Sequence, residues 1–117
     1  ELIDAVDLCS SLYIRKEMGD HALAVTRELS RRVPSHPDAW RLRARAELAL
    51  NDARAARRSI EKSLELDPDN PAAHALHAQI LLRYGKRKPA RAAYRRALEL
   101  DPGETLRAKV ERGLSRM

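Results

Sequence analysis

The chain has 117 residues, of which 34% are charged and 44% are hydrophobic, and its formal net charge is +6 at pH 7. It contains no Phe and only 3% aromatic residues, so any core must be built from Leu, Ala, Ile and Val. No apolar run approaches the ~20 residues that a membrane-spanning helix needs, and a single cysteine, Cys9, excludes an intrachain disulfide.

A period of 34 residues organises the sequence. The pentapeptide LELDP occurs at 64–68 and again at 98–102. The same offset relates five sets of residues: Pro34, Pro68 and Pro102; Ala22, Ala56 and Ala90; Ala5, Ala39 and Ala73; Leu8, Leu42 and Leu76; and Ile14, Leu48 and Leu82. Self-similarity at a fixed period of about 20–50 residues is typical of a solenoid. We therefore predict repeats at 3–36, 37–70 and 71–104, followed by a capping helix at 105–117.

The first repeat carries the weakest signals. Its first helix is predicted from Val6, Leu12, Tyr13 and Ile14, and its second helix from Ala22, Val25, Leu29 and Val33. Gly19-Asp20 predicts the turn between them, two positions later than the turns of the other repeats. Either the first helix is longer or the alignment slips by two residues. Cys9 lies among apolar residues and is expected to be a small core residue.

The second repeat has clear helix boundaries. Pro37 is expected in a first helical turn, where its missing N–H is tolerated. Asn51-Asp52 predicts the turn, with Asp52 as the N-cap of the next helix. The stretch 67–70 (DPDN) ends that helix, because Pro cannot continue it and Asp and Asn favour turns.

The third repeat follows the same plan and leads into the cap. Pro71 opens a helix that ends near Gly85, a natural residue after a helix C-terminus. Pro89 falls early in the next helix, and Thr105–Arg116 predicts one more helix with a polar face. The prediction is thus an all-α solenoid of about seven helices in one domain. Because the chain opens at Glu1 without Met or a signal-like segment, we expect a soluble domain excised from a longer protein, cytoplasmic or periplasmic.

These units resemble the tetratricopeptide repeat, a 34-residue helix–turn–helix. In the second repeat the matching residues are Trp40, Ala44, Leu48, Ala56, Leu64 and Asp67-Pro68. In the third they are Ala78, Leu81, Gly85, Ala90, Tyr94, Ala97 and Asp101-Pro102. The resemblance covers residues 3–104 and implies a right-handed superhelix of antiparallel helix pairs.

The chain departs from the family pattern at a few positions. Arg43 and His77 stand where the family usually has Leu, and Glu47 stands where a large aromatic residue is common. Glu47 follows Arg43 by four residues, so we expect the two to pair along one helix face. Their charged tips are expected to reach solvent or a neighbouring repeat, with a looser junction between the first two repeats.

The resemblance also implies a concave groove, lined by the first helix of each repeat, that binds peptides or helices of other proteins. Carried onto this chain, the partner-binding residues are Arg41, Leu42, Arg45, Gln79, Leu82 and Arg83, and the cap adds Lys109. Arginine grips carboxylates with two parallel hydrogen bonds, so the complementary partner is acidic and apolar. The alternative is that these arginines are solvated and that Leu42 and Leu76 belong to the core.

A clamp for chaperone C-termini is not expected. Chaperone-binding members of the family grip a terminal carboxylate with Lys and Asn side chains. The matching positions here are Asp7, Ser11, Leu42, Ala72 and Leu76, and none of them supplies the donor.

The positive charge lies in the C-terminal half. Residues 3–36 and 37–70 are each neutral, whereas 71–104 carry +4 and 105–117 carry +3. Arg87, Arg91 and Arg95 are spaced to share one outer helix face. Such a patch suits nucleic acid or an anionic membrane, but it lacks stacking aromatics, so we expect a solvated face instead. The excess of arginine over lysine is typical of a GC-rich genome, and we expect a bacterial source.

No chemical motif points to an enzyme. The sequence has no nucleophile elbow, no glycine-rich phosphate loop and no paired-cysteine motif. His74 and His77 are three residues apart, but no third ligand lies near them in sequence, so neither a metal site nor a cofactor is expected.

Our first hypothesis is a protein-binding module. One alternative is a scaffold segment that uses Leu2, Ile3 and Val6 either to self-associate or to pack on the rest of a larger protein. The other is a basic adaptor for nucleic acid or membranes.

Overall fold

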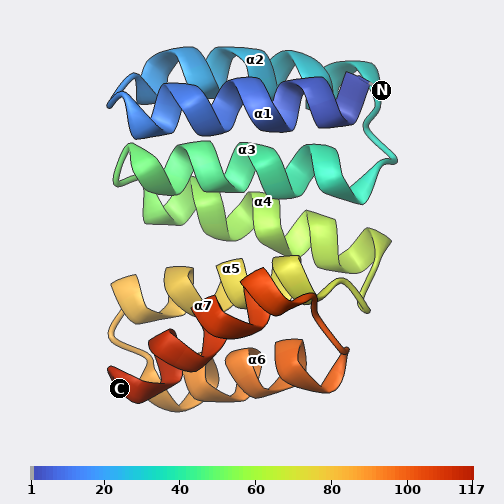
Figure 1. Cartoon of the computed structure of the whole chain (residues 1–117). Coiled ribbons are helices and arrows are strands. Elements are labelled where there is room, and N and C mark those ends of the chain that lie inside the picture. The colour runs from blue at the N-terminus through green and yellow to red at the C-terminus, as the bar shows by residue number, and fades with distance from the viewer. Residues whose placement is uncertain (1) are drawn as a thin grey trace.

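The computed structural model describes residues 2–117, which form seven α-helices; α1 to α6 stack in chain order and α7 crosses α5 and α6 (Figure 1). The helices are α1 (Leu2–Arg15), α2 (Gly19–Arg32), α3 (Pro37–Ala49), α4 (Ala53–Leu66), α5 (Pro71–Arg83), α6 (Arg87–Glu99) and α7 (Glu104–Ser115). Each odd-numbered helix from α1 to α5 forms an antiparallel hairpin with the helix that follows it. The predicted all-α repeat architecture is confirmed.

The helix boundaries repeat with the 34-residue period, including those of the first repeat. Helices α1, α3 and α5 end at equivalent positions, and a residue with positive φ lies two positions after each end: Glu17 (60°), Asn51 (63°) and Gly85 (74°). The expected turn at Gly19-Asp20 is therefore wrong, and so are both explanations offered for it. Gly19 opens α2, where an added Cβ would lie 2.7 Å from Leu50 Cδ2. This glycine serves close packing between repeats rather than a turn.

The predicted helix starts are confirmed for the second and third repeats. Pro37 and Pro71 open α3 and α5. Asp52 accepts a hydrogen bond from the Ala55 N–H at 3.1 Å, as an N-cap does. Asn70 caps α5 by accepting from the N–H groups of its second and third residues. These caps satisfy donors that the first helical turn leaves unpaired.

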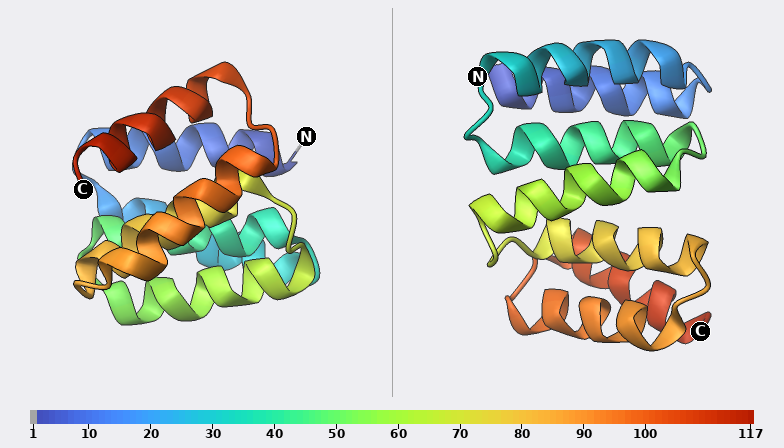
Figure 2. Two further views of the ribbon diagram at one scale, coloured as in Figure 1. Left: turned by 90° about the horizontal axis from the view of Figure 1, so that it is seen from below. Right: turned by 180° about the vertical axis from the view of Figure 1, so that it is seen from behind.

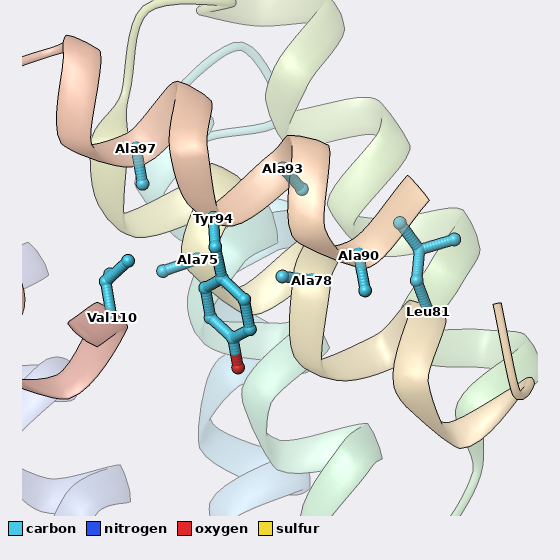
Figure 3. Packing of buried hydrophobic residues seen from close by; sticks show 8 residues of the cluster. All are labelled: Ala75, Ala78, Leu81, Ala90, Ala93, Tyr94, Ala97 and Val110. Carbon is cyan, nitrogen blue, oxygen red and sulfur yellow. The ribbon is translucent and has the colours of Figure 1, made fainter. Parts of the chain in front are cut away.

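The core lies between the helices and contains many alanines. Ala22, Ala56 and Ala90, which share one repeat position, are all fully buried. Their small side chains let neighbouring backbones approach closely. Figure 3 shows the C-terminal cluster, in which Tyr94 of α6 points toward α7 and Val110. Gly113 permits this approach, because an added Cβ would lie 2.7 Å from the Tyr94 ring.

The predicted Arg43–Glu47 pair forms, but it is less exposed than expected. Arg43 Nε donates to Glu47 Oε2 at 3.2 Å, and Ser59 Oγ donates to Glu47 Oε1 at 2.6 Å. Glu47 is only 3% exposed, so its tip is held inside its own repeat. Arg43 also donates to Ser30 Oγ of α2 at 3.3 Å. This contact ties the first two repeats together, and α3 packs on α2 more extensively than α5 packs on α4, so the junction is not loosened.

Helix α7 leaves the repeat direction. It lies obliquely across α5 and α6, on the same side of the stack as α1 (Figure 2). Val110 anchors it in the core at 1% exposure, whereas Lys109, Glu111, Arg112 and Arg116 are exposed. Within residues 2–117, no helix is both long and apolar enough to cross a membrane.

Candidate functional site

A cavity of about 130 Å³ opens where α3, α5, α6 and α7 meet. Its lining residues are Arg41, Arg45, Ala72, Ala75, Leu76, Gln79, Tyr94, Leu106, Lys109 and Val110. Three of these side chains are cationic, and none of the residues that line the cavity is a carboxylate. Cationic side chains therefore line the cavity together with apolar ones.

Arg45 connects this cavity to the first repeat. Its Nη2 donates to Asp7 Oδ1 at 3.0 Å and to Ser11 Oγ at 2.7 Å, both on α1. Its Nε is buried and has no acceptor within residues 2–117. A buried donor without a partner costs about 1–3 kcal/mol. Arg45 thus enters the cavity wall with its orientation fixed and one N–H unsatisfied.

Arg41 is held in a similar way by α3 itself. Its Nε donates to Asp38 Oδ1 at 3.2 Å, and the same oxygen accepts from Asn70 Nδ2 at 3.0 Å. Only 16% of the Arg41 side chain is exposed. Because a guanidinium carries five N–H donors, one carboxylate partner leaves donors for a ligand. The N-cap of α5 thus helps to orient a cation of the cavity.

The floor combines aliphatic groups with one phenol. Leu76 is 7% exposed and Tyr94 is 4% exposed. Burial raises the pKa of Tyr94, an effect that the nearby Arg116 opposes. The phenol therefore stays protonated at neutral pH and remains a hydrogen-bond donor. A ligand here would contact apolar groups and the N–H donors of Arg41, Arg45 and Lys109.

The structure brings together only part of the predicted groove set. Arg41, Arg45 and Gln79 line the cavity, and Lys109 of the cap joins them. Leu42 is fully buried beside Leu29 and is not available to a ligand. It occupies the core position that the alternative interpretation gave it.

The other two predicted groove residues, Leu82 and Arg83, do not line the cavity. Leu82 is half-buried and packs against the C-terminal core cluster. The Nη1 of Arg83 donates to Asn51 Oδ1 at 2.7 Å, at the α3–α4 turn. Tyr94, Leu106 and Val110 do line the cavity but were not among the predicted site residues. Tyr94 was expected in the apolar stripe of its helix, and the oblique course of α7 brings Leu106 and Val110 to the cavity.

The predicted basic outer patch is exposed on α6. Arg87, Arg91 and Arg95 are all exposed, and none forms an ion pair within residues 2–117. The neighbouring Arg96, in contrast, pairs with Asp69 and Glu99, each at 3.3 Å. The three arginines are thus a solvated helix face in this structure.

The two histidines of α5 lie in a separate, open cavity with Glu61 and Arg57. His74 Nε2 lies 2.7 Å from the Pro68 carbonyl oxygen. Trp40, one repeat earlier, donates from Nε1 to the Pro34 carbonyl at 2.8 Å. His74 and Trp40, at the same repeat position, thus both contact the carbonyl oxygen of the proline in the loop that precedes their helix. Within residues 2–117, no three His, Cys, Asp or Glu side chains are grouped to hold a metal ion.

His77 should make stability depend on pH. Burial lowers its pKa from 6.5, an effect that Glu61 opposes and that His74 and Arg57 reinforce. The native state then binds fewer protons than the unfolded chain between the two pKa values, so stability falls as the pH drops through this window. His77→Leu should flatten the fall of the melting temperature below pH 6.5. An unchanged pH profile in circular dichroism melts would contradict this role.

Comparisons with known proteins agree with the fold. The sequence matches the tetratricopeptide repeat family over residues 14–80 and again over residues 47–111. No curated protein matches the sequence. These two overlapping matches cover most of the chain.

Solved structures show the same fold at low sequence identity. The type III secretion translocator chaperone SycD of Yersinia enterocolitica superposes with a TM-score of 0.83 at 16% identity, covering 98% of this chain and 89% of that one. The first tetratricopeptide domain of human RPAP3 gives 0.77 at 20% identity, covering 98% and 94%. The Sgt2 domain of Aspergillus fumigatus gives 0.77 at 16% identity, covering 97% and 79%. The chain belongs to the tetratricopeptide repeat family.

Proposed function

We propose that this protein binds a segment of another protein whose side chains are acidic and apolar, in the cavity between α3, α5 and α7. The observation that carries the proposal is the composition of the cavity wall. Arg41, Arg45 and Lys109 surround an apolar floor, and no carboxylate is among the lining residues. Asp38 and Asp7 each pair with one arginine from outside the cavity, whereas Lys109 forms no ion pair within residues 2–117. A peptide in which Glu or Asp is followed by a residue such as Leu would complement both the cationic side chains and the apolar floor.

The chemistry favours a carboxylate over other groups. Arginine binds carboxylates through paired N–H donors, and such charge-assisted bonds are stronger than neutral ones. Arg45 contacts α1 through Nη2, and its Nη1 forms no hydrogen bond within residues 2–117, which leaves donors for a ligand. Because Asp7 and Asp38 hold the two arginines in place, little side-chain entropy remains to be lost on binding. Binding alone, without any chemical step, is the proposed mechanism.

A solved relative supports peptide binding as the general mode. One structure of the first tetratricopeptide domain of RPAP3 is described as bound to the HSP90 peptide SRMEEVD, which is rich in carboxylates. Its identity to this chain is 19%, so the likeness concerns the fold. This chain lacks Lys and Asn at the positions expected of a chaperone clamp. We therefore infer that it recognises acidity through Arg41, Arg45 and Lys109, from a different part of the groove.

The proposal can be tested by selecting ligands from a display library of random dodecapeptides. The wild-type protein should enrich peptides in which Asp or Glu adjoins Leu, Ile or Met. A synthetic enriched peptide should bind Lys109→Glu at least about 10-fold more weakly, because a charge pair becomes a repulsion. Lys109 is exposed, so the variant is expected to fold.

The matched control is Lys88→Glu, which makes the same charge change at an exposed position of α6. It should leave the affinity of the enriched peptide unchanged. Equal losses in both variants would show that only overall charge matters. Enrichment of peptides without acidic residues would contradict the proposed ligand chemistry.

A further inference from the structure

The outward face of α1 exposes apolar side chains that the fold leaves uncovered. Leu2 is 50% exposed, Leu8 is 64% exposed and Leu12 is 43% exposed. Ala5 lies on the same helix and is also exposed. In contrast, Ile3 and Val6, expected above as part of a self-association surface, pack against the core cluster of Leu29. The exposed apolar set therefore differs from the predicted one.

The 34-residue period identifies this face as a packing surface. The exposed set on α1 has equivalents 34 and 68 residues further along the chain. For Ala5, Leu8 and Leu12 these are Ala39, Leu42 and Ala46 in the second repeat, and Ala73, Leu76 and Ile80 in the third. All six equivalents are at most 7% exposed, because the preceding helix pair covers them. Helix α1 also has apolar residues at these positions, but no helix covers them. Burial of the exposed parts of these leucines would be favourable, because it removes apolar surface from water.

The charges along α1 favour an antiparallel partner helix with the same sequence. Asp4 lies in the first turn and Arg15 in the last turn. They are eleven residues apart, which is close to three helical turns, so both lie on the flank that also carries Leu8. In an antiparallel pair, the acidic end of each helix meets the basic end of the other. Helix α1 is thus self-complementary in charge as well as apolar.

The opposite end of the stack does not offer a matching surface. Helix α6 forms that end of the stack (Figure 1) and exposes Arg87, Arg91 and Arg95. Head-to-tail stacking of α1 on α6 would bury these charges against leucines, which is costly. A closed, two-fold contact between two α1 helices avoids this cost.

We propose that two copies of this chain form a dimer through antiparallel α1 helices, with the two-fold axis near Leu8 and Cys9. In this arrangement Ala5 packs against Leu12 of the second copy, and Asp4 lies beside Arg15 of the second copy. The surface is separate from the cavity between α3, α5 and α7. The dimer therefore leaves this cavity open in each of the two copies. It does not depend on the proposed ligand.

The test is sedimentation equilibrium of the whole chain from low micromolar to near-millimolar concentration. The wild type should approach twice the 13.2 kDa mass of the monomer. Leu8→Glu should raise the dimer dissociation constant at least about 30-fold, as expected for a central interface residue. Because Leu8 is exposed in the monomer, the Leu8→Glu variant at low concentration should melt at the same temperature as the wild type. Leu66→Glu is the control, since Leu66 is also exposed but lies on α4.

Charge reversal tests the antiparallel arrangement. Arg15→Glu should weaken the dimer, and Asp4→Arg combined with Arg15→Glu should restore it, because the two charges are then exchanged. A monomer at every concentration would overturn the proposal and leave the face for a different segment or protein. Equal weakening by Leu66→Glu, or no recovery in the exchanged variant, would also overturn it.

Discussion

Replacing Ala90 with aspartate should destabilise the fold more than any other single change considered for this chain. Ala90 is fully buried in α6, within the cluster that contains Ala78 and Leu81. A carboxylate at this position would be buried without a partner, which costs about 3–5 kcal/mol. That is a large part of the ~5–15 kcal/mol that holds a domain folded. Thermal melts followed by circular dichroism should show a fall in melting temperature of roughly 15 °C.

The control for this prediction lies two residues further along the same helix. Ala92 is exposed, so Ala92→Asp introduces the same charge and a similar loss of helix propensity without burial. Its effect should stay near ±0.5 kcal/mol, as is usual for surface substitutions. Similar melting temperatures for the two variants would mean that α6 does not pack as described. The comparison isolates burial from the intrinsic cost of aspartate in a helix.

The repeat period predicted most of the fold because it combines local and packing information. A position such as Ala22, Ala56 or Ala90 recurs since each repeat packs on its neighbours in the same way. Proline and Asp or Asn at the starts of helices then fixed the boundaries of α3, α4 and α5. These are local effects of backbone geometry and capping, so they are visible in a single sequence.

The errors arose where a residue serves tertiary packing. Gly19 suggested a turn, but its role is to admit Leu50, a contact between repeats that no local pattern reveals. The real turn has Glu17 at a positive φ, a conformation that favours glycine and is uncommon for glutamate. Sequence reasoning therefore placed the turn at the nearest glycine.

The repeated pentapeptide LELDP shows the limit of local sequence most directly. Its first copy continues α4 to Leu66 and leaves Asp67 extended, with φ of −149°. In its second copy α6 ends at Glu99, and Asp101 has φ of 57°. The segments that follow differ: the first leads into α5 and the second into the oblique α7. Identical residues thus end two helices differently because their continuations pack differently.

The same limit explains the outcome at the candidate site. The family position of Arg41 and Arg45 was enough to predict that the two lie on one surface, and the structure brings them to one cavity. The part of the lining that Leu106 and Val110 supply depends on the crossing angle of α7, which no repeat pattern specifies. Leu42 was ambiguous from the sequence because groove and core positions are adjacent on one helix.

Truncating Leu42 should distinguish a core position from a surface position of the same repeat. Leu42 is fully buried between α3 and the first helix pair, whereas its equivalent Leu8 is 64% exposed. Leu42→Ala should therefore lower the free energy of unfolding by about 2–5 kcal/mol, through lost burial and the remaining cavity. Leu8→Ala should change it by no more than about 0.5 kcal/mol when the protein is dilute. Urea unfolding measures both values.

The concentration dependence of this comparison adds a second result. If two copies bury Leu8, the cost of Leu8→Ala should grow as the protein concentration rises, because association stabilises the folded state by mass action. The cost of Leu42→Ala should not grow in this way, since Leu42 is already buried within one chain. A small, constant cost for Leu42→Ala would contradict its place in the core. One pair of equivalent leucines thus separates the packing inside a chain from the packing between chains.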